Sequence, residues 1–263
     1  MNATITSGYA RLDRIVPDWS NARIVIVAGR PALGKTAFVV SLARNFAIDQ
    51  RMQIAFFSMK ESERVLKNRF MSNICELDIS KINDNTLNEE EKAKYKMGLE
   101  KFNDCPIFIE GSSRMSVSDF SSKARHAVFD LGARMIFVDY LQLMNCGKEI
   151  VSKRRKEISS ITHSIRDVAE ELDVPIIVNT FLPNRTKYSR KVPCLADIER
   201  IGNIGRASDV ILLIHRPEFY GFADDWPSYK GIAEIIVIKN IYGKKGSFLL
   251  GFIPEFSRFY NLV

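Results

Sequence analysis

The sequence predicts an α/β protein with a mostly parallel, twisted sheet, helices on both faces of that sheet and an antiparallel hairpin at one edge. Short apolar runs of strand length alternate with longer segments of helical length, which is the pattern of a parallel sheet with helical crossovers. Two apolar runs near the C-terminus flank the turn 242–246, which is typical of a hairpin. Hydrophobic residues make up 46% of the 263 positions and no repeat or linker interrupts the chain, so we expect a single domain.

The first half of the chain is expected to alternate strands with helices. Apolar runs bounded by polar residues predict strands at residues 24–28, 53–58 and 106–109. The segment 60–76 carries apolar side chains at helical spacing, and the segment 88–101 is so highly charged that water should cover most of its surface. We expect helices from residue 37 to about 51, over 60–76, over 88–101, and from a capped start at Ser116 to about residue 131.

The second half continues the alternation and ends in the hairpin. Strands are expected at residues 135–139, 174–179 and 210–214, and the two hairpin strands at 233–239 and 247–253. A long helix is expected over residues 153–172. A basic loop follows the 174–179 strand as far as Pro193.

The composition argues against a membrane-spanning or disulfide-stabilised protein. No apolar run approaches the ~18 residues of a membrane span, and the first residues form neither a basic leader nor an apolar signal core. The cysteines stand singly, without CxxC pairs or zinc-ligand spacing. We therefore expect no membrane partner, a cytoplasmic location and four buried, unpaired thiols: Cys75, Cys105, Cys146 and Cys194.

The strongest motif follows the first predicted strand. Residues 29–36, GRPALGKT, match the phosphate-binding loop G-x-x-x-x-G-K-[ST] at every fixed position, between a strand and a helix start. The glycines let phosphate oxygens approach the backbone, and the helix N-terminus favours an anion. Lys35 would reach the β- and γ-phosphates of a nucleoside triphosphate. We expect nucleotide contacts from Gly29, Arg30, Pro31, Ala32, Leu33, Gly34, Lys35, Thr36 and Ala37.

A second motif closes the strand at residues 135–139. An apolar strand that ends in an aspartate is typical of the Walker B element of nucleotide-binding proteins. Asp139 would contact Mg²⁺ directly or through a bound water, and the hydroxyl of Thr36 would be a second ligand. The alternative is that Asp139 merely forms a turn. The phosphate loop upstream favours the functional role.

Basic residues gather in the loops that follow two of the predicted strands. Arg154 and Arg155 come after the 135–139 strand, and Arg185 and Lys187 come after the 174–179 strand. Ligands of parallel sheets bind at the carboxyl ends of the strands. A single-stranded nucleic-acid backbone suits a basic groove at that edge, in keeping with the net charge of +7. The alternative is an ordinary solvated charged face.

Taken together, these motifs resemble the C-terminal, RecA-like motor domain of DnaB-type replicative DNA helicases, over nearly the whole chain. Segments similar to that family are found at residues 8–13, 28–38, 139–144, 157–159 and 254–259. The resemblance implies a RecA-like P-loop ATPase that binds ATP and Mg²⁺ at subunit interfaces of a homo-oligomer, a hexameric ring. It also implies single-stranded DNA in the ring channel and other replication proteins as partners. We expect the family's separate N-terminal helical domain to be absent from this chain.

The same resemblance assigns a DNA-contacting loop and a following helix to residues 197–209. The family's Arg-Glu order is reversed there as Glu199-Arg200. We add Arg200 and Gly202 to the DNA-binding candidates on this ground.

Three departures from the family pattern fall on catalytic positions. The family's water-polarising glutamate is replaced by Lys60, with Glu61 beside it, and its glutamine after the 174–179 strand is replaced by Phe181. Its arginine finger is replaced by Ile241, although the lysine two residues earlier is kept as Lys239. Loss of an arginine finger costs ~10³–10⁵ in rate, and loss of a general base ~10²–10⁴.

Three hypotheses remain open from the sequence. The first is a DNA helicase motor with substitute catalytic groups: Glu61 as base, Asp139 at the metal, and Lys239, Lys244 or Lys245 as the cation that crosses the interface. Consecutive residues point to different sides, so Glu61 can substitute only if the backbone shifts. The second is a helicase-like protein that holds ATP and binds DNA or a replication protein without unwinding. The third, a RecA-like recombination or regulatory ATPase, is disfavoured by the family-specific segment 139–144.

Overall fold

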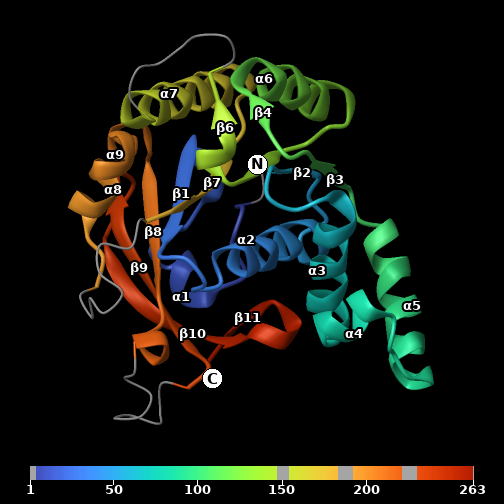
Figure 1. Ribbon diagram of the computed structural model, residues 1–263. Helices are drawn as coiled ribbons and strands as arrows, with labels where there is room; N and C mark the ends of the chain where they lie inside the picture. Colours follow the sequence, from blue (N-terminus) through green and yellow to red (C-terminus); the bar gives the residue numbers. More distant parts are fainter. Residues whose placement is uncertain (1–3, 147–153, 183–191, 221–229, 263) are drawn as a thin grey trace.

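The computed structural model describes residues 4–146, 154–182, 192–220 and 230–262. Within those ranges one sheet of nine strands runs through the molecule in the order β11-β10-β9-β8-β1-β7-β5-β2-β3 (Figure 1). Its strands are β1 (Ile24–Gly29), β2 (Ile54–Ser58), β3 (Ile107–Gly111), β5 (Met135–Asp139), β7 (Ile176–Phe181), β8 (Val210–His215), β9 (Ile232–Asn240), β10 (Gly246–Ile253) and β11 (Arg258–Asn261). The six strands from β8 to β3 pair in parallel, and β9, β10 and β11 pair antiparallel at one edge.

Helices cover both faces of this sheet, as Figure 1 shows. One face carries α2 (Lys35–Arg44), which continues as a π-helical turn over Asn45–Asp49, and α3 (Glu63–Cys75), α4 (Ile79–Asp84) and α5 (Glu89–Asn103). The other face carries α6 (Val117–Arg125), with a π-helical turn over His126–Asp130, and α7 (Arg154–Leu172), α8 (Leu195–Gly202) and α9 (Ile204–Ala207). The α/β class, the mostly parallel sheet and the antiparallel edge are therefore confirmed.

The buried strand β1 explains why the sheet needs helices on both sides. Successive side chains of a strand point to opposite faces. Val25 and Val27 belong to the apolar cluster of α2 and α3, whereas Ile24 and Ile26 belong to the cluster of α6 and α7. All of β1 is buried, so its unbroken apolar run is the pattern of a strand covered on both faces.

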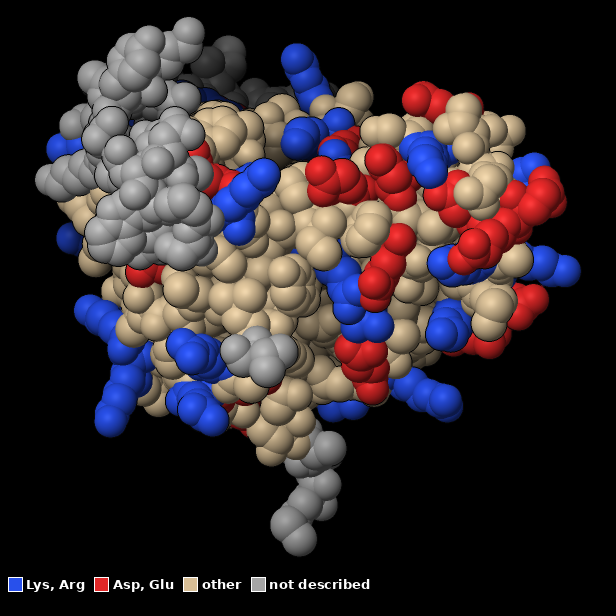
Figure 2. All heavy atoms as spheres, turned by 90° about the horizontal axis from the view of Figure 1, so that it is seen from below, with Lys and Arg blue, Asp and Glu red and all other residues tan. Residues whose placement is uncertain are grey.

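The predicted helix starts are marked by side-chain caps. Ser116 accepts the backbone N–H of Asp119, whose carboxylate accepts the N–H of Ser116 in return, and Asn88 and Glu91 form the same reciprocal pair at α5. Such caps satisfy backbone donors that a helix leaves free at its start. Two ion pairs, Lys92–Glu89 and Lys94–Glu90, lie within α5, and Figure 2 shows acidic and basic side chains intermixed on the side of the molecule where α3, α4 and α5 lie.

Some local expectations were wrong. Residues 197–209 are not a loop followed by a helix but most of α8 and all of α9, because the cap at Cys194 starts a helix earlier. The thiols are not all buried: Cys194 is exposed at the start of α8 and the other three are half-buried. The strand β11, the helix α4 and a small sheet of β4 (Met115–Ser116) with β6 (Met144–Asn145) were not anticipated. Within the described ranges, no helix combines the length and apolarity that crossing a membrane requires.

Strand direction sorts the loops to two edges of the sheet. The loops after β1, β2, β5 and β7 lie at the carboxyl edge, because these four strands run parallel. The tip of the β9–β10 hairpin lies at the opposite edge, since Asn240 is paired with Val210 at the start of β8. This separation decides which candidate residues can meet in one molecule.

Candidate nucleotide-binding site

The loop between β1 and α2 forms an anion-binding turn. Gly34 has a φ of +88° and caps the N-terminus of α2, and Ala32 is also in the left-handed region with a φ of +65°. The φ favours glycine at position 34, and a Cβ atom there would also lie only 3.0 Å from the ring of Phe252, a tight contact. The first turn of α2 therefore points its free N–H groups at the space beside the loop, where a phosphate would be stabilised.

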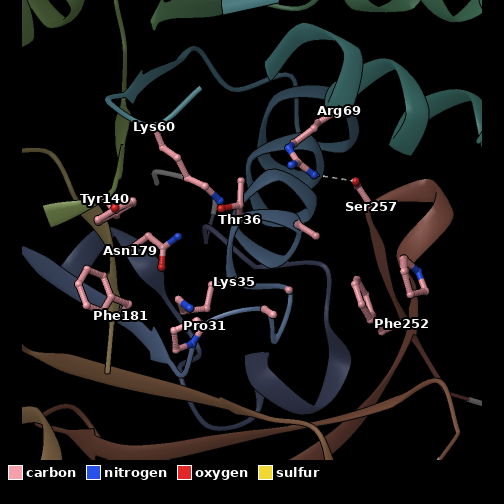
Figure 3. Close-up of a pocket in the computed structure, with 14 residues that line it drawn as sticks. Pro31, Lys35, Thr36, Lys60, Arg69, Tyr140, Asn179, Phe181, Phe252 and Ser257 are labelled. Atoms are coloured by element: carbon pink, nitrogen blue, oxygen red, sulfur yellow. Dashed lines mark hydrogen bonds between the residues drawn. The ribbon is translucent and has the colours of Figure 1, made fainter. Parts of the chain in front are cut away.

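A cavity of about 500 Å³ opens over this loop at the carboxyl edge of the sheet (Figure 3). The phosphate loop and α2 form one wall, the ends of β2, β5 and β7 form a second, and the C-terminal segment around Phe252 and Ser257 forms a third. The residues that line the cavity are Pro31, Ala32, Gly34, Lys35, Thr36, Ala37, Lys60, Arg69, Tyr140, Asn179, Phe181, Phe252, Pro254 and Ser257. The volume is in the range of small-molecule and cofactor sites.

Lys35 lies at the base of this cavity. Its Nζ donates to the carbonyl oxygen of Arg30 at 2.7 Å, within its own loop. Burial lowers the pKa of Lys35 to about 8, with the Asp139 carboxylate opposing the shift and the Lys60 ammonium adding to it. An incoming phosphate would supply the counter-charge that this buried ammonium lacks.

Asp139 is fully buried at the end of β5, beside Asn179 in the neighbouring strand β7. The Nδ2 of Asn179 donates to the Oδ1 of Asp139 at 2.5 Å. Among the described residues, the Oδ2 of Asp139 has no hydrogen-bond partner. Burial raises the pKa of Asp139, and Lys60, Thr36 and Asn179 oppose that shift. A buried carboxylate oxygen left free next to the hydroxyl of Thr36 is a donor set that fits Mg²⁺, which prefers hard oxygen ligands.

The loop after β2 presents a lysine, not a carboxylate, to the cavity. Lys60 lines the cavity, and in Figure 3 its side chain extends into it on the side of Thr36. Glu61 is not among the lining residues. Its carboxylate, 9% exposed, accepts both the Nε and the Nη2 of Arg69 at 2.5 and 2.7 Å. A bidentate arginine pair of this kind stabilises the charged carboxylate and holds it in place.

Several pocket residues were not predicted from the sequence. Arg69 reaches the cavity from α3, and its Nη1 donates to the Oγ of Ser257 at 3.2 Å (Figure 3). Gln142 does not line the cavity but holds the loop after β5 against β7, because its Nε2 donates to Thr180 Oγ1 at 2.6 Å and to the Phe181 carbonyl at 3.0 Å. Of these residues, only Asn179 could have been predicted from the sequence, because it ends the predicted strand 174–179, which follows the strand that ends in Asp139.

The candidate cation Lys239 lies on the other side of the molecule. It sits near the end of β9, at the sheet edge opposite the phosphate loop, and its Nζ donates to the carbonyl of Gly205 at 2.7 Å and to that of Ser208. Ile241 follows at the hairpin tip and is 55% exposed, and Lys244 and Lys245 are exposed beside it. None of these four residues can therefore reach the phosphate loop of its own chain.

The DNA-binding candidates in the described part of the chain lie together where α7 meets α8. Arg154 donates to the carbonyl of Gln142 at 2.5 Å, and Arg155 donates to the carbonyl of Glu199 at 3.1 Å, so both join structural elements. The Arg200 side chain is 46% exposed and contacts Asp197 at 3.2 Å. Gly202 is buried against α7, where a Cβ would lie 2.8 Å from the Arg155 carbonyl. Arg185 and Lys187 lie outside the described residues.

Comparison with known proteins gives a consistent result. The domain family described as "DnaB-like helicase C terminal domain" matches residues 4–261. The chain is 30% identical over 259 residues to "Replicative DNA helicase DnaB" of Geobacillus stearothermophilus and 30% identical over 259 residues to "Replicative DNA helicase DnaC" of Bacillus subtilis (strain 168). Each match covers 98% of this chain but 56% of the relative, so the chain spans little more than half of their length.

Solved structures agree with the sequence comparison. One of them, described as an ATPase domain, has a TM-score of 0.89 and 27% identity, covering 99% of this chain and 92% of that chain. A structure of a DnaB-like replicative helicase, whose description also names its interactions with primase, has a TM-score of 0.90 and 27% identity, covering 99% of this chain and 62% of that chain.

Proposed function

Because this chain belongs to the DnaB-like helicase C-terminal domain family, homologous to the ATPase motor domains of replicative helicases, we propose that it binds ATP and single-stranded DNA and couples slow ATP hydrolysis to DNA unwinding in replication. The observation that carries the proposal is that Lys35 and Thr36 line one cavity at the carboxyl edge of the sheet, with the Asp139 carboxylate buried beside Thr36. We treat residues 1–263 as one such motor domain.

Nucleotide binding follows from the chain's own groups. The N–H groups at the start of α2 would donate to phosphate oxygens, and the Lys35 ammonium would exchange the Arg30 carbonyl for the β- and γ-phosphates. Thr36 and Asp139 would hold Mg²⁺, which neutralises charge on the phosphates when it is bound. The aromatic rings of Phe252 and Phe181 line the rest of the cavity and would exclude water from it.

Hydrolysis is proposed to be slow because, among the residues described, no carboxylate lines the cavity and Asp139 is buried. Glu61 could act as the base only after it leaves Arg69, and breaking this partly buried ion pair costs ~1–3 kcal/mol. Lys239, already bound to two carbonyls, would likewise have to give up those contacts to act as a cross-interface cation. Lys244 and Lys245 carry no such cost.

Assembly into a ring would bring the hairpin tip of one subunit to the cavity of the next. The two features lie at opposite edges of the sheet, so a head-to-tail contact is the arrangement in which they can meet. We propose a hexameric homo-oligomer in the cytoplasm, with single-stranded DNA contacted by Arg154, Arg155, Arg200, Arg185 and Lys187, whereas Gly202, buried against α7, would allow α7 and α8 to pack closely. Other replication proteins are proposed as partners.

A second candidate function is favoured by one specific observation. The bidentate Glu61–Arg69 pair, together with the exposed Ile241 where the family carries its arginine finger, suits a protein that holds ATP as a structural ligand. Such a protein would bind DNA or a replication protein and would not unwind.

Strand displacement separates the two candidates. The purified chain is mixed with ATP, Mg²⁺ and a forked duplex, and Lys35→Ala serves as the blank. Displacement above the blank supports the motor. A chain that binds a fluorescent ATP analogue and DNA but displaces no strand is the nucleotide-holding protein. Failure to bind the analogue would contradict both.

A further inference from the structure

Two ammonium groups approach the phosphate site of this cavity. Lys35 lies at its base, and Lys60 extends into it from the loop after β2 (Figure 3). The Asp139 carboxylate opposes the fall in the pKa of Lys35 that burial causes, and Lys60 adds to that fall and opposes the rise in the pKa of Asp139. The Lys60 side chain is 47% exposed. Its ion contact within the described ranges is weak, 3.9 Å from the Oε1 of Glu61, which already pairs with Arg69.

One carboxylate oxygen near Lys60 is left without a partner. The Oδ2 of Asp139 is buried without a hydrogen-bond partner in the described part of the chain, and Thr36 lies beside it at the start of α2. An ammonium group has three donors on a flexible stem, so it can contact Asp139 in the empty cavity and a phosphate oxygen in the filled one. Lys60 is not needed to hold the fold, since it is half-exposed and its ion contact with Glu61 is long.

We propose that Lys60 is a built-in counter-cation for the terminal phosphate, so that this cavity binds nucleoside triphosphates with little dependence on divalent cation. The inference rests on the proposed nucleotide binding and deepens it. Lys60 contributes one positive charge and up to three hydrogen bonds at the place where Thr36 and Asp139 would hold Mg²⁺. Because an ammonium cannot take a proton from water, the same residue strengthens binding and gives no assistance to hydrolysis.

The charge balance explains why a second lysine matters. A triphosphate without its metal carries about four negative charges, and Lys35 alone leaves most of them uncompensated. A charge-assisted hydrogen bond to the γ-phosphate can be made to ATP and not to ADP, which lacks that group. Lys60 therefore also sets a preference for the triphosphate over the diphosphate.

The test is a titration with a fluorescent ATP analogue, in excess Mg²⁺ and in excess EDTA, on the full chain. We compare the parent with Lys60→Gln, which keeps most of the side-chain length and removes the charge, and with Lys60→Arg, which keeps the charge. Lys92→Ala is the matched control, because Lys92 is a solvent-exposed lysine of α5. The parent should change its dissociation constant by less than about threefold between the two conditions. Lys60→Gln should lose about 10–100-fold in EDTA, the range expected for a hydrogen bond to a charged group, and much less in Mg²⁺.

The outcomes separate this inference from the proposed function. Recovery of EDTA binding by Lys60→Arg, with an ATP-to-ADP preference that falls in Lys60→Gln, supports the counter-cation. A parent that binds in Mg²⁺ and loses binding in EDTA overturns it and leaves nucleotide binding standing. A parent that binds in neither condition overturns the proposed function itself. Equal binding by the parent and Lys60→Gln in EDTA also contradicts the role of Lys60.

Discussion

Two loops at the carboxyl edge of the sheet differ in how closely their residues match the pattern of the helicase family. The loop from β1 to α2 retains each group that contacts phosphate or metal in P-loop proteins, and glycine at position 34 is favoured by both φ and space. In the loop from β2 to α3, Lys60 lines the same cavity, whereas Glu61 forms an ion pair with Arg69. Under the proposed function, nucleotide binding and hydrolysis would therefore depend on separate segments of the chain.

The hairpin of β9 and β10, like the loop from β2 to α3, departs from the family pattern at a position expected to be catalytic. Its tip carries Ile241, and Lys239 is bound to the carbonyls of Gly205 and Ser208 within its own chain. Under the proposed function, the differences at Lys60 and Ile241 would leave the chain without groups that act on the attacking water or on the developing charge, and neither lies in the phosphate loop. The predictions below test whether the two loops are as independent as this contrast indicates.

The largest effect is expected in the retained loop. Lys35→Ala removes the ammonium at the base of the cavity and should weaken nucleotide binding about 100-fold or more, because two charged hydrogen bonds are lost together. A fluorescent-nucleotide titration measures it, with Lys92→Ala as the control that should bind like the parent. Parent-like affinity in Lys35→Ala would sink the phosphate-loop assignment.

The next effect is expected in the altered loop. Lys60→Glu places a carboxylate where the lysine now faces the cavity and should raise steady-state ATP hydrolysis about tenfold or more, toward the ~10²–10⁴ that a positioned base supplies. The assay is phosphate release in excess Mg²⁺. Lys60→Gln is the matched control and should show no gain. An unchanged rate in Lys60→Glu would mean that the base is not what this loop lacks.

Glu61→Gln should change stability more than activity. The carboxylate is held by Arg69 and does not line the cavity, so hydrolysis should stay within about threefold of the parent, while the loss of a shielded ion pair lowers the free energy of unfolding by ~1–3 kcal/mol. Urea unfolding measures the change in stability, and phosphate release measures the hydrolysis rate. Glu89→Gln, in an exposed pair on α5, is the control and should cost less than ~1 kcal/mol. A tenfold fall in hydrolysis would restore Glu61 as the base.

The smallest effect is expected at the DNA-binding candidates. Arg200 is half-exposed and contacts Asp197 on its own helix, so Arg200→Ala should weaken single-stranded DNA binding a few-fold and lower the salt slope by ~1. Affinity measured across a range of salt concentrations tests it. Arg125→Ala, an exposed arginine of α6 paired with Glu171, is the control. Equal slopes in all three proteins would remove Arg200 from the DNA contact.

Features that depend on local sequence pattern could be predicted, whereas contacts between residues far apart in the sequence could not. The phosphate loop and Asp139 could be found because strand, turn and helix signals surround them. Arg69 could not be assigned to the cavity, because its partner Ser257 lies 188 positions away and returns to the site through β10 and β11. The hydrogen bond from Lys239 to the Gly205 carbonyl likewise depends on the pairing of β9 with β8, which the sequence pattern does not specify. Cys194 is exposed at the start of α8, a helix that was not predicted because a loop was expected in this region.

The contrast between the two loops is tested most directly by measuring nucleotide occupancy and ATP hydrolysis on the same sample, with and without single-stranded DNA, with Lys35→Ala as the blank. We predict near-complete occupancy of the parent and a hydrolysis rate well below ~1 s⁻¹, the low end for working enzymes, that DNA raises only slightly. A DNA-stimulated parent rate at or above ~1 s⁻¹ would contradict the account, because the altered loop would then be catalytically sufficient.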